Sequence, residues 1–374
     1  MTQKYTSLGL MSGTSGDGVD ASLIRSDGIN EYQVIKEKYF EYSNEIYQNI
    51  HDVREKIYTI KDLEKFEKEL NNLEKQITLF HATVVKEMSN DVITDIVGFH
   101  GQTIYHNSKD KISKQLGDGK LLSQLTKKKI VYNFRQNDID NGGEGAPLAS
   151  IFHQLIVTKK KLDLPTCVLN IGGISNATLV NEPSGSLNFS SKDIGPGNCL
   201  IDSWVRKNSK KRFDKNGLLA LSGNTNDIVL EQASELFHNS SSKKNLSLDV
   251  NDFDVSFARG LSLEDGAATL TDFTAKLIGE SLVEFLSKTK TKNIKILICG
   301  GGRKNQTLVK LIKQNVPSEL IFEIIDDHGI NGDFIESQAF AFLAIRTILK
   351  MPISFPDTTG CEKPTLGGEI VNFK

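Results

Sequence analysis

The sequence predicts a two-lobed α/β protein with mixed sheets and a nucleotide cleft between the lobes. Three glycine-rich turns carry this prediction, at Gly13–Asp20, at Gly172–Gly173 and at Gly300–Gly302. The first two turns each join two runs of strand character, so each half of the chain contains a glycine hairpin. Glycine lets a backbone turn tightly and approach an anion closely. Two α/β lobes with such a hairpin in each make a nucleotide cleft.

The first half of the chain begins with a pattern typical of an antiparallel meander of strands. The spacing of its apolar residues then changes to one typical of helices. Strand character appears in five runs, residues 5–11, 19–24, 31–40, 95–100 and 129–134. Between residues 51 and 89, apolar residues recur at steps of three and four, which predicts two amphipathic helices with a break between them. A coiled coil is the alternative interpretation of that segment.

The second half repeats this order. Strands are predicted at residues 166–171, 177–180 and 294–299, and helices after Asn198, over about 266–287, from about Asn305 and from Glu336. The tail from residue 351 onward is rich in Pro, Gly and Thr, and we expect it to pack back over the surface. We expect a first lobe of residues 1–138 plus 356–374 and a second lobe of residues 139–355.

Composition excludes several classes of protein. The 374 residues carry a net charge of −2, which argues against nucleic acid or a membrane surface as the main partner. The N-terminus has no apolar signal segment, and no run approaches membrane-spanning length. The four cysteines form no C-x-x-C pair and the seven histidines no H-x-x-x-H pair, so no zinc site is expected. We expect a cytoplasmic protein with reduced thiols.

The first glycine turn has the composition of an anion site. Its glycines let backbone N–H groups approach an anion closely. Its hydroxyl groups add hydrogen-bond donors for phosphate oxygens. Two carboxylates, Asp17 and Asp20, would repel a bare polyphosphate, so they indicate a metal ion or a sugar hydroxyl nearby. The full candidate set is Gly13, Thr14, Ser15, Gly16, Asp17, Gly18, Val19 and Asp20. An ordinary surface hairpin is the alternative, because Gly and Asp are turn residues in any case.

Several longer stretches follow in a definite order. They are Gly9-Leu-Met-Ser-Gly-Thr-Ser-x-Asp-Gly-Val-Asp20, His100-Gly-Gln-Thr103, Asn133-Phe-Arg-x-x-Asp-Ile139, Gly142-Gly-x-Gly-Ala-Pro-Leu148, Leu169-Asn-Ile-Gly-Gly-Ile-x-Asn176, Asp193-x-Gly-Pro-Gly-Asn198, Gly300-Gly-Gly302 and Glu336-x-x-Ala-Phe-Ala-Phe-Leu-Ala344. Together they resemble the anhydro-N-acetylmuramic acid kinase family, from about residue 7 to the C-terminus. Gly16 stands where that family usually has Leu, and Ile194 where Thr is common.

The resemblance implies an actin-like ATPase fold of the ribonuclease H-like kind and a specific reaction. Members open the 1,6-anhydro bridge of the sugar with water and transfer the γ-phosphoryl group of ATP to the freed O6. ATP and Mg²⁺ are therefore the expected cofactors, and a homodimer the expected assembly. ATP would lie on residues 13–20, Gly172, Gly173, Gly300, Gly301 and Gly302, with Asp17 or Asp20 orienting Mg²⁺ through waters.

The resemblance also implies roles for single residues. Asp193, expected on the loop before a helix, would take the proton of the water, and Glu336 would help to orient that water. Arg135, Asp138 and His100 would contact the sugar. Each has a structural alternative: a turn for Asp193, a helix N-terminus for Glu336, a mutual ion pair for Arg135 and Asp138, and a structural histidine for His100.

Two other functions compete with this one. A kinase of the same superfamily could act on another sugar or on a small carboxylate. A nucleotide-gated binding protein would perform no phosphotransfer, as in the chaperone and actin branches of the superfamily. The presence of Asp193 together with the whole first hairpin argues against the binding protein.

Overall fold

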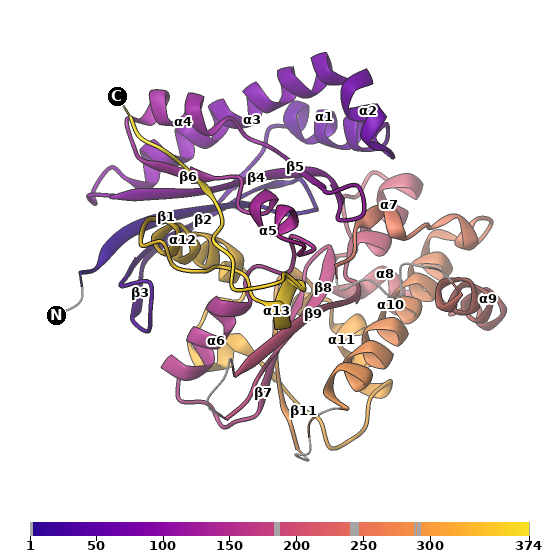
Figure 1. Cartoon of the computed structure of the whole chain (residues 1–374). Coiled ribbons are helices and arrows are strands. Elements are labelled where there is room, and N and C mark those ends of the chain that lie inside the picture. Colours follow the sequence, from indigo (N-terminus) through magenta and orange to yellow (C-terminus); the bar gives the residue numbers. More distant parts are fainter. Residues whose placement is uncertain (1–2, 183–187, 240–246, 288, 290–292, 374) are drawn as a thin grey trace. The chain divides into compact units, whose positions relative to one another are not determined.

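The computed structural model describes residues 3–182, 188–239, 247–287, 289 and 293–373. The chain forms two compact units, residues 1–161 with 333–374 and residues 162–332. Each is built on a mixed sheet with helices, as the predicted fold class requires (Figure 1). The unit boundaries differ from the expected lobe boundaries at 138/139 and 355/356, and the packing of two helices of the first unit accounts for the difference.

The first unit contains a seven-stranded sheet. Its strands are β1 (Tyr5–Ser12), β2 (Gly18–Ser26), β3 (Tyr32–Glu41), β4 (Ile96–Asn107), β5 (Ile112–Leu116), β6 (Ile130–Tyr132) and β12 (Glu369–Val371). The order is β12-β6-β4-β1-β2-β3, with β5 paired to β4. β1 is antiparallel to β2 and parallel to β4. The tail does pack back, since β12 pairs with β6.

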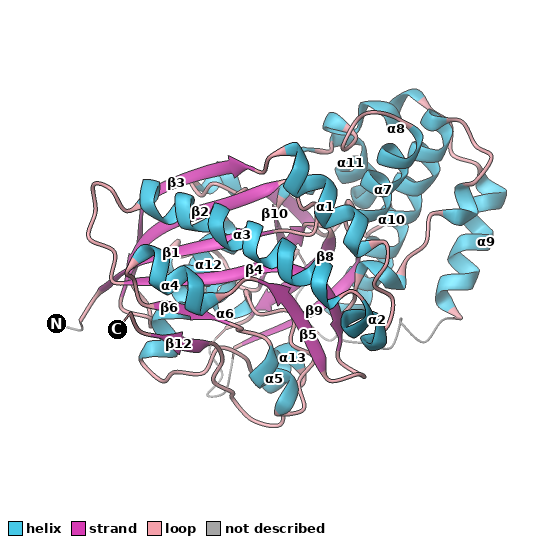
Figure 2. Ribbon diagram, turned by 90° about the horizontal axis from the view of Figure 1, so that it is seen from above, coloured by secondary structure: helices cyan, strands magenta, loops and turns pink. Residues whose placement is uncertain are grey.

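Helices cover both faces of this sheet. They are α1 (Asn44–Arg54), α2 (Ile60–Lys65), α3 (Glu67–Met88), α4 (Gly119–Thr126), α5 (Gln136–Asp140), α6 (Ser150–Lys159), α12 (Ile335–Ile348) and α13 (Pro356–Thr359). α1, α3 and α4 lie on one face and α12 on the other (Figures 1 and 2). The core under α3 includes Leu8, Leu73 and Ile77, which are all fully or almost fully buried.

α12 approaches the sheet closely because two strand positions lack a side chain. A Cβ on Gly9 would lie 1.9 Å from the Ser337 carbonyl oxygen, and a Cβ on Gly98 would lie 2.3 Å from that of Phe340. α6 packs against the same helix, with the rings of Phe152 and Phe342 5.7 Å apart. Both helices therefore belong to the first unit, although the expected boundaries placed them in the second lobe.

Two local predictions for this unit are corrected. Residues 51–89 lie in three helices instead of two, and the first begins at Asn44 because the Ser43 hydroxyl accepts the Ile46 N–H at 3.3 Å. The strand expected to end at His100 continues to Asn107. Gly101, with a φ of +76°, lets that strand bend, and β5 pairs with the extension.

The second unit contains a five-stranded sheet in the order β11-β10-β7-β8-β9. The strands are β7 (Thr166–Ile171), β8 (Ile174–Val180), β9 (Phe189–Pro196), β10 (Lys295–Cys299) and β11 (Ile321–Ile324). β10 is parallel to β7 and β11, whereas β8 is antiparallel to β7 and β9. The predicted second glycine hairpin is therefore the β7–β8 connection.

The helices of this unit are α7 (Cys199–Asn208), α8 (Leu218–Ser222), α9 (Asp227–His238), α10 (Leu263–Leu286) and α11 (Gln306–Gln314). α10 packs on the sheet through Ala275, Ile278 and Leu282, which share one core with Leu169 and Ile194. Across the parts of the chain that the structure describes, no helix is both long and apolar enough to cross a bilayer.

Candidate active site

The first glycine turn joins β1 to β2, and other elements hold its carbonyl groups. Three successive carbonyl oxygens accept bonds from side chains: Gly13 from Gln102 Nε2 at 2.9 Å, Thr14 from Arg54 Nη1 at 2.6 Å, and Ser15 from His51 Nε2 at 3.0 Å. Arg54 also donates from Nη2 to the Thr103 carbonyl at 3.1 Å, so it ties the turn to β4. The turn is thus fixed from its carbonyl side.

This arrangement leaves donors on the other side of the turn. Among the residues that the structure describes, the backbone N–H groups of Thr14 and Ser15 have no hydrogen-bond partner. The Gly16 N–H instead closes the turn onto the Gly13 carbonyl at 3.1 Å. The Ser15 hydroxyl donates to Asp17 Oδ1 at 2.5 Å. Adjacent unpaired N–H groups suit an anion such as phosphate.

A buried network supports the turn from below. The Ser12 hydroxyl oxygen lies 2.8 Å from Gln102 Oε1, 2.9 Å from the Gly18 carbonyl oxygen and 3.0 Å from the Tyr42 hydroxyl, so its single hydrogen has two acceptors in reach. Burial raises the pKa of Tyr42 above its usual 10.0, so its hydroxyl stays protonated. Because the network joins β1, β2 and β4, it locks the two ends of the turn to the sheet.

Gly16, the departure from the family pattern, has a conformation that suits glycine. Its φ is +62°, in the left-handed region. A Cβ at this position would lie 2.9 Å from Ile50 Cγ2 of α1. The leucine that is usual in the family would therefore be strained in this turn.

The three predicted sugar contacts form a connected group in the first unit. Arg135 donates from Nε and Nη2 to His100 Nε2, at 3.1 and 3.0 Å, and from Nη1 to the Gly145 carbonyl at 2.8 Å. His100 donates from Nδ1 to the Gly101 carbonyl at 2.8 Å. Burial, together with the Arg135 charge, holds the pKa of His100 well below its usual 6.5. His100 is therefore neutral and acts as an acceptor for Arg135.

Asp138 does not make the ion pair with Arg135 that the structural alternative assumed. It is fully buried, Oδ2 accepts the Gly145 N–H at 2.7 Å, and Oδ1 accepts the Thr359 hydroxyl at 2.7 Å. Gly143 packs against the same carboxylate, since a Cβ there would lie 2.2 Å from Oδ2. Asp138 thus holds the loop before α6 and joins it to α13.

Asp193 lies within β9, not on the loop before a helix as predicted. The strand continues to Pro196 because β8 pairs with it as far as Ile174. Asp193 is only 5% exposed, and its Oδ2 accepts the Leu248 N–H at 2.9 Å. This bond fixes the orientation of the carboxylate.

Glu336, the other predicted catalytic residue, belongs to the first unit and stands half-buried in the first turn of α12. A carboxylate at this place interacts favourably with the helix dipole. A favourable place at a helix N-terminus therefore accounts for the position of Glu336 as well as a catalytic role does.

In the second unit, three motifs meet at one end of the sheet. β7 and β10 are parallel neighbours with Asn170 opposite Cys299. The glycine turns that follow these two strands therefore lie at the same end of the sheet, at the carboxyl ends of the strands. A Cβ on Gly302 would lie 2.2 Å from Ile171 Cγ2, which shows how closely the turns pack. The Gly172 carbonyl accepts the Asn198 N–H at 2.8 Å, at the start of α7. Gly172–Gly173, Gly300–Gly302 and the end of β9 are thereby brought together.

Sequence reasoning missed the side chains that hold these turns. Arg303, only 8% exposed, binds Asp326 and the Gly300 carbonyl. Arg54 and His51 lie on the polar side of an amphipathic helix, and no motif distinguishes them from solvated residues. Gln102 does stand in the recognised His100–Thr103 stretch, so that motif was a usable signal.

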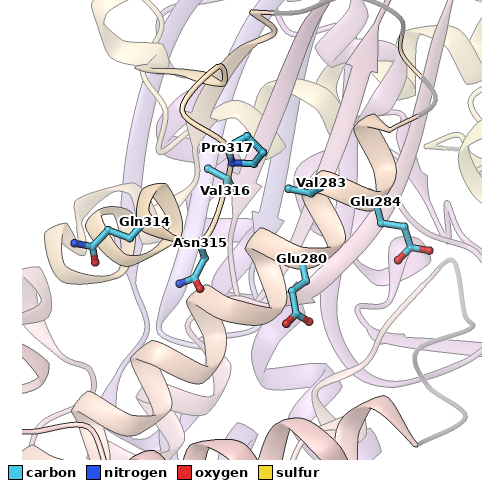
Figure 3. A pocket seen from close by; sticks show the side chains of 7 residues that line it. All are labelled: Glu280, Val283, Glu284, Gln314, Asn315, Val316 and Pro317. Atoms are coloured by element: carbon cyan, nitrogen blue, oxygen red, sulfur yellow. The ribbon is translucent and has the colours of Figure 1, made fainter.

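A pocket of about 730 Å³ lies elsewhere in the second unit, between α10 and the end of α11 (Figure 3). Glu280, Val283 and Glu284 of α10 and the segment Gln314–Pro317 line it. It includes none of the predicted site residues, and Glu280 is paired with His238 at 2.8 Å. No group of three or more His, Cys, Asp or Glu side chains suited to a metal ion occurs among the described residues.

The chain matches the sequence model described as anhydro-N-acetylmuramic acid kinase over residues 5–372. The protein of that name from Pelagibacter ubique (strain HTCC1062) is 54% identical over 373 residues, covering 99% of each chain. Its namesake from Zymomonas mobilis is 36% identical, covering 97% of this chain and 98% of that protein.

Solved structures give weaker likenesses. The activator of 2-hydroxyisocaproyl-CoA dehydratase from Clostridium difficile with bound ADPNP is 12% identical with a TM-score of 0.40, over 92% of this chain and 96% of that one. A hexokinase from Schistosoma mansoni complexed with glucose is 8% identical with a TM-score of 0.37, over 91% and 85%.

Proposed function

Because the chain belongs to the anhydro-N-acetylmuramic acid kinase family, we propose that it uses ATP and water to convert 1,6-anhydro-N-acetylmuramic acid into N-acetylmuramic acid 6-phosphate and ADP. This reaction returns the amino sugar of the cell wall to metabolism. We place it in the cytoplasm, where ATP is supplied and where its four buried free cysteines stay reduced.

The bonds exchanged define what the site must do. The water oxygen bonds to C1, the C1–O6 bond breaks, and O6 bonds to the γ-phosphorus as ADP leaves. The proton of the water needs a base, as in an inverting glycosidase. We assign that role to Asp193. The observation that carries the assignment is its buried carboxylate in β9, oriented by the Leu248 N–H at 2.9 Å.

Phosphoryl transfer asks mainly for positioning and charge neutralisation. The unpaired N–H groups of Thr14 and Ser15 support a phosphate site on residues 13–20. We assign Gly172–Gly173 and Gly300–Gly302 to the nucleotide as well, since both turns follow neighbouring parallel strands and lie at the same end of the sheet. We assign Glu336 to orienting the water.

Magnesium is part of the proposal. The half-buried carboxylates of Asp17 and Asp20 offer oxygen atoms, the donors that Mg²⁺ prefers, and would orient it through waters. Mg²⁺, when bound, neutralises charge on the transferred phosphoryl group. Asp17 already accepts the Ser15 hydroxyl, so its carboxylate is oriented within the turn.

For the sugar, we propose Arg135 as the contact to the lactyl carboxylate, which matches a guanidinium. His100 and Asp138 assist it, His100 by accepting from Arg135 and Asp138 by fixing Gly145. We also propose that the enzyme acts as a homodimer, which light scattering on the purified protein tests directly.

The experiment incubates the protein with ATP, Mg²⁺ and the anhydro sugar, and follows ADP and the sugar 6-phosphate. Asp193→Asn should lower turnover on the order of 10² to 10⁴-fold. Lys192→Gln, at the adjacent position in β9, is the matched control and should retain activity. ADP release with a free 6-hydroxyl sugar but none with the anhydro sugar would overturn the proposed substrate, and full turnover by Asp193→Asn would remove the base assignment.

A further inference from the structure

Asn176 lies directly beside the proposed base. It stands on β8 as the cross-strand partner of Asp193 on β9. The next pair on the same face is Thr178, two residues after Asn176, and Ser191, two residues before Asp193. Thr178 Oγ1 and Ser191 Oγ lie 3.1 Å apart, so this register brings side chains of the two strands together on one face. Residues two apart in a strand share a face. Asn176 and Asp193 therefore point to the same side of the sheet as neighbours.

Among the polar side chains on this face of β7, β8 and β9, the amide of Asn176 differs in its hydrogen bonding. Its Oδ1 atom is buried and finds no hydrogen-bond donor within the described residues. Its neighbours are satisfied, since Thr178 and Ser191 bond each other and Asn170 Oδ1 accepts the Cys299 thiol at 3.6 Å. A buried polar atom without a partner usually indicates a functional or hydrated position. The missing partner is a hydrogen donor, and the atom that lacks it is on the residue that pairs with Asp193 across the two strands.

We propose that Asn176 positions the attacking water, an inference that rests on the proposed function. The water donates one hydrogen bond to Asn176 Oδ1 and the other to the Asp193 carboxylate. Its lone pair then points away from both groups, towards C1 of the sugar. As the water oxygen bonds to C1 and the C1–O6 bond breaks, the proton moves to Asp193, while Asn176 stays neutral and keeps the second hydrogen bond.

The amide suits this role better than a second carboxylate would. A neutral acceptor holds the water without competing for its proton. A carboxylate at the same place would repel the charge on Asp193 and raise the apparent pKa of the pair. The backbone of β8 holds Asn176 opposite Asp193 in the sheet. The amide therefore gives the water a second fixed hydrogen-bond partner, which the base alone cannot provide.

Two variants test the proposal with ATP, Mg²⁺ and the anhydro sugar. Asn176→Ala should lower kcat on the order of 10²-fold because the water loses its orientation, with the KM for ATP unchanged. Asn176→Asp keeps the shape and the acceptor but adds a charge. It should move the acidic limb of the kcat/KM profile to higher pH by about one unit, a shift that a merely structural amide would not produce. Thr178→Val, one step along the same face, is the matched control and should change neither quantity.

The outcomes separate the proposal from the function on which it rests. A wild-type protein without turnover on the anhydro sugar overturns the proposed function and this inference with it. Wild-type turnover with a kcat for Asn176→Ala within threefold of wild type overturns the inference alone, as does an equal loss in Thr178→Val. If Asn176→Ala fails to fold, Asn176→Asp decides, and an unmoved acidic limb contradicts the role.

Discussion

The guanidinium of Arg303 binds both carboxylate oxygens of Asp326, with Nε–Oδ2 at 2.7 Å and Nη2–Oδ1 at 2.9 Å. The third donor group, Nη1, reaches the Gly300 carbonyl at 3.0 Å. The Gly300 N–H in turn donates to the Gly332 carbonyl at 3.0 Å. One two-pronged ion pair thus fixes the glycine turn after β10 to the segment that follows β11.

Replacing Arg303 by lysine should loosen this turn. Lysine keeps the charge but loses the planar two-pronged contact and the bond to Gly300. We expect a loss of about 2 kcal/mol in the free energy of unfolding, the size of a hydrogen bond to a charged group, and a raised KM for ATP. Denaturant unfolding and steady-state kinetics measure the two effects. Lys310→Gln, on the exposed side of α11, should leave both unchanged; an equal effect there would contradict the prediction.

The same ion pair predicts a pH dependence of stability. Hydrogen bonds from Arg303 hold the pKa of Asp326 below its usual 3.8. A carboxyl whose pKa is lowered on folding stabilises the protein above its unfolded pKa, and this stabilisation is lost as the pH falls through the folded pKa. Asp326→Asn should therefore cost stability at pH 7, and the difference from wild type should shrink below pH 4. Unfolding curves from pH 7 to 3 test this, and a difference that stays constant would refute it.

Arg54 should control the affinity of the first turn for phosphate. Its bonds to the Thr14 and Thr103 carbonyls span 40 and 49 residues of sequence, so no local interaction replaces them. Arg54→Met keeps the apolar stem and removes both bonds. We expect the KM for ATP to rise about tenfold or more, because each charged hydrogen bond contributes about 1.5–3 kcal/mol. Arg25→Met, at an exposed position of the otherwise largely buried strand β2, is the matched control. A nucleotide affinity equal to wild type in Arg54→Met would exclude the role.

Gly16→Leu should destabilise the first unit. The left-handed φ of +62° and the 2.9 Å approach of a Cβ to Ile50 both oppose a side chain there. We expect a loss of about 1–3 kcal/mol, the cost of a strained backbone position. Gly13→Ala is the control, since its Cβ would meet no atom closer than 4.0 Å. Thermal unfolding compares the two variants, and equal melting temperatures would show that the turn can change its conformation.

Much of the fold could be predicted because local patterns carry it. The strands of both hairpins and the 24-residue helix α10 follow from apolar periodicity and turn residues. The errors lie where tertiary pairing extends an element. β4 runs past His100 because β5 pairs with it, and Asp193 lies in β9 because β8 continues beside it.

The sequence alone determined the order of the glycine turns and the family, because both depend on residue types at short spacings. Asp193 became the candidate base only through what the family resemblance implies. The tertiary structure decided which side chains hold the turns and which neighbour stands beside the base. Arg54 meets Thr14, Arg303 meets Asp326, and Asn176 faces Asp193 only because packed helices and paired strands bring distant residues together. Such contacts leave no local periodicity, so no pattern in the chain could reveal them.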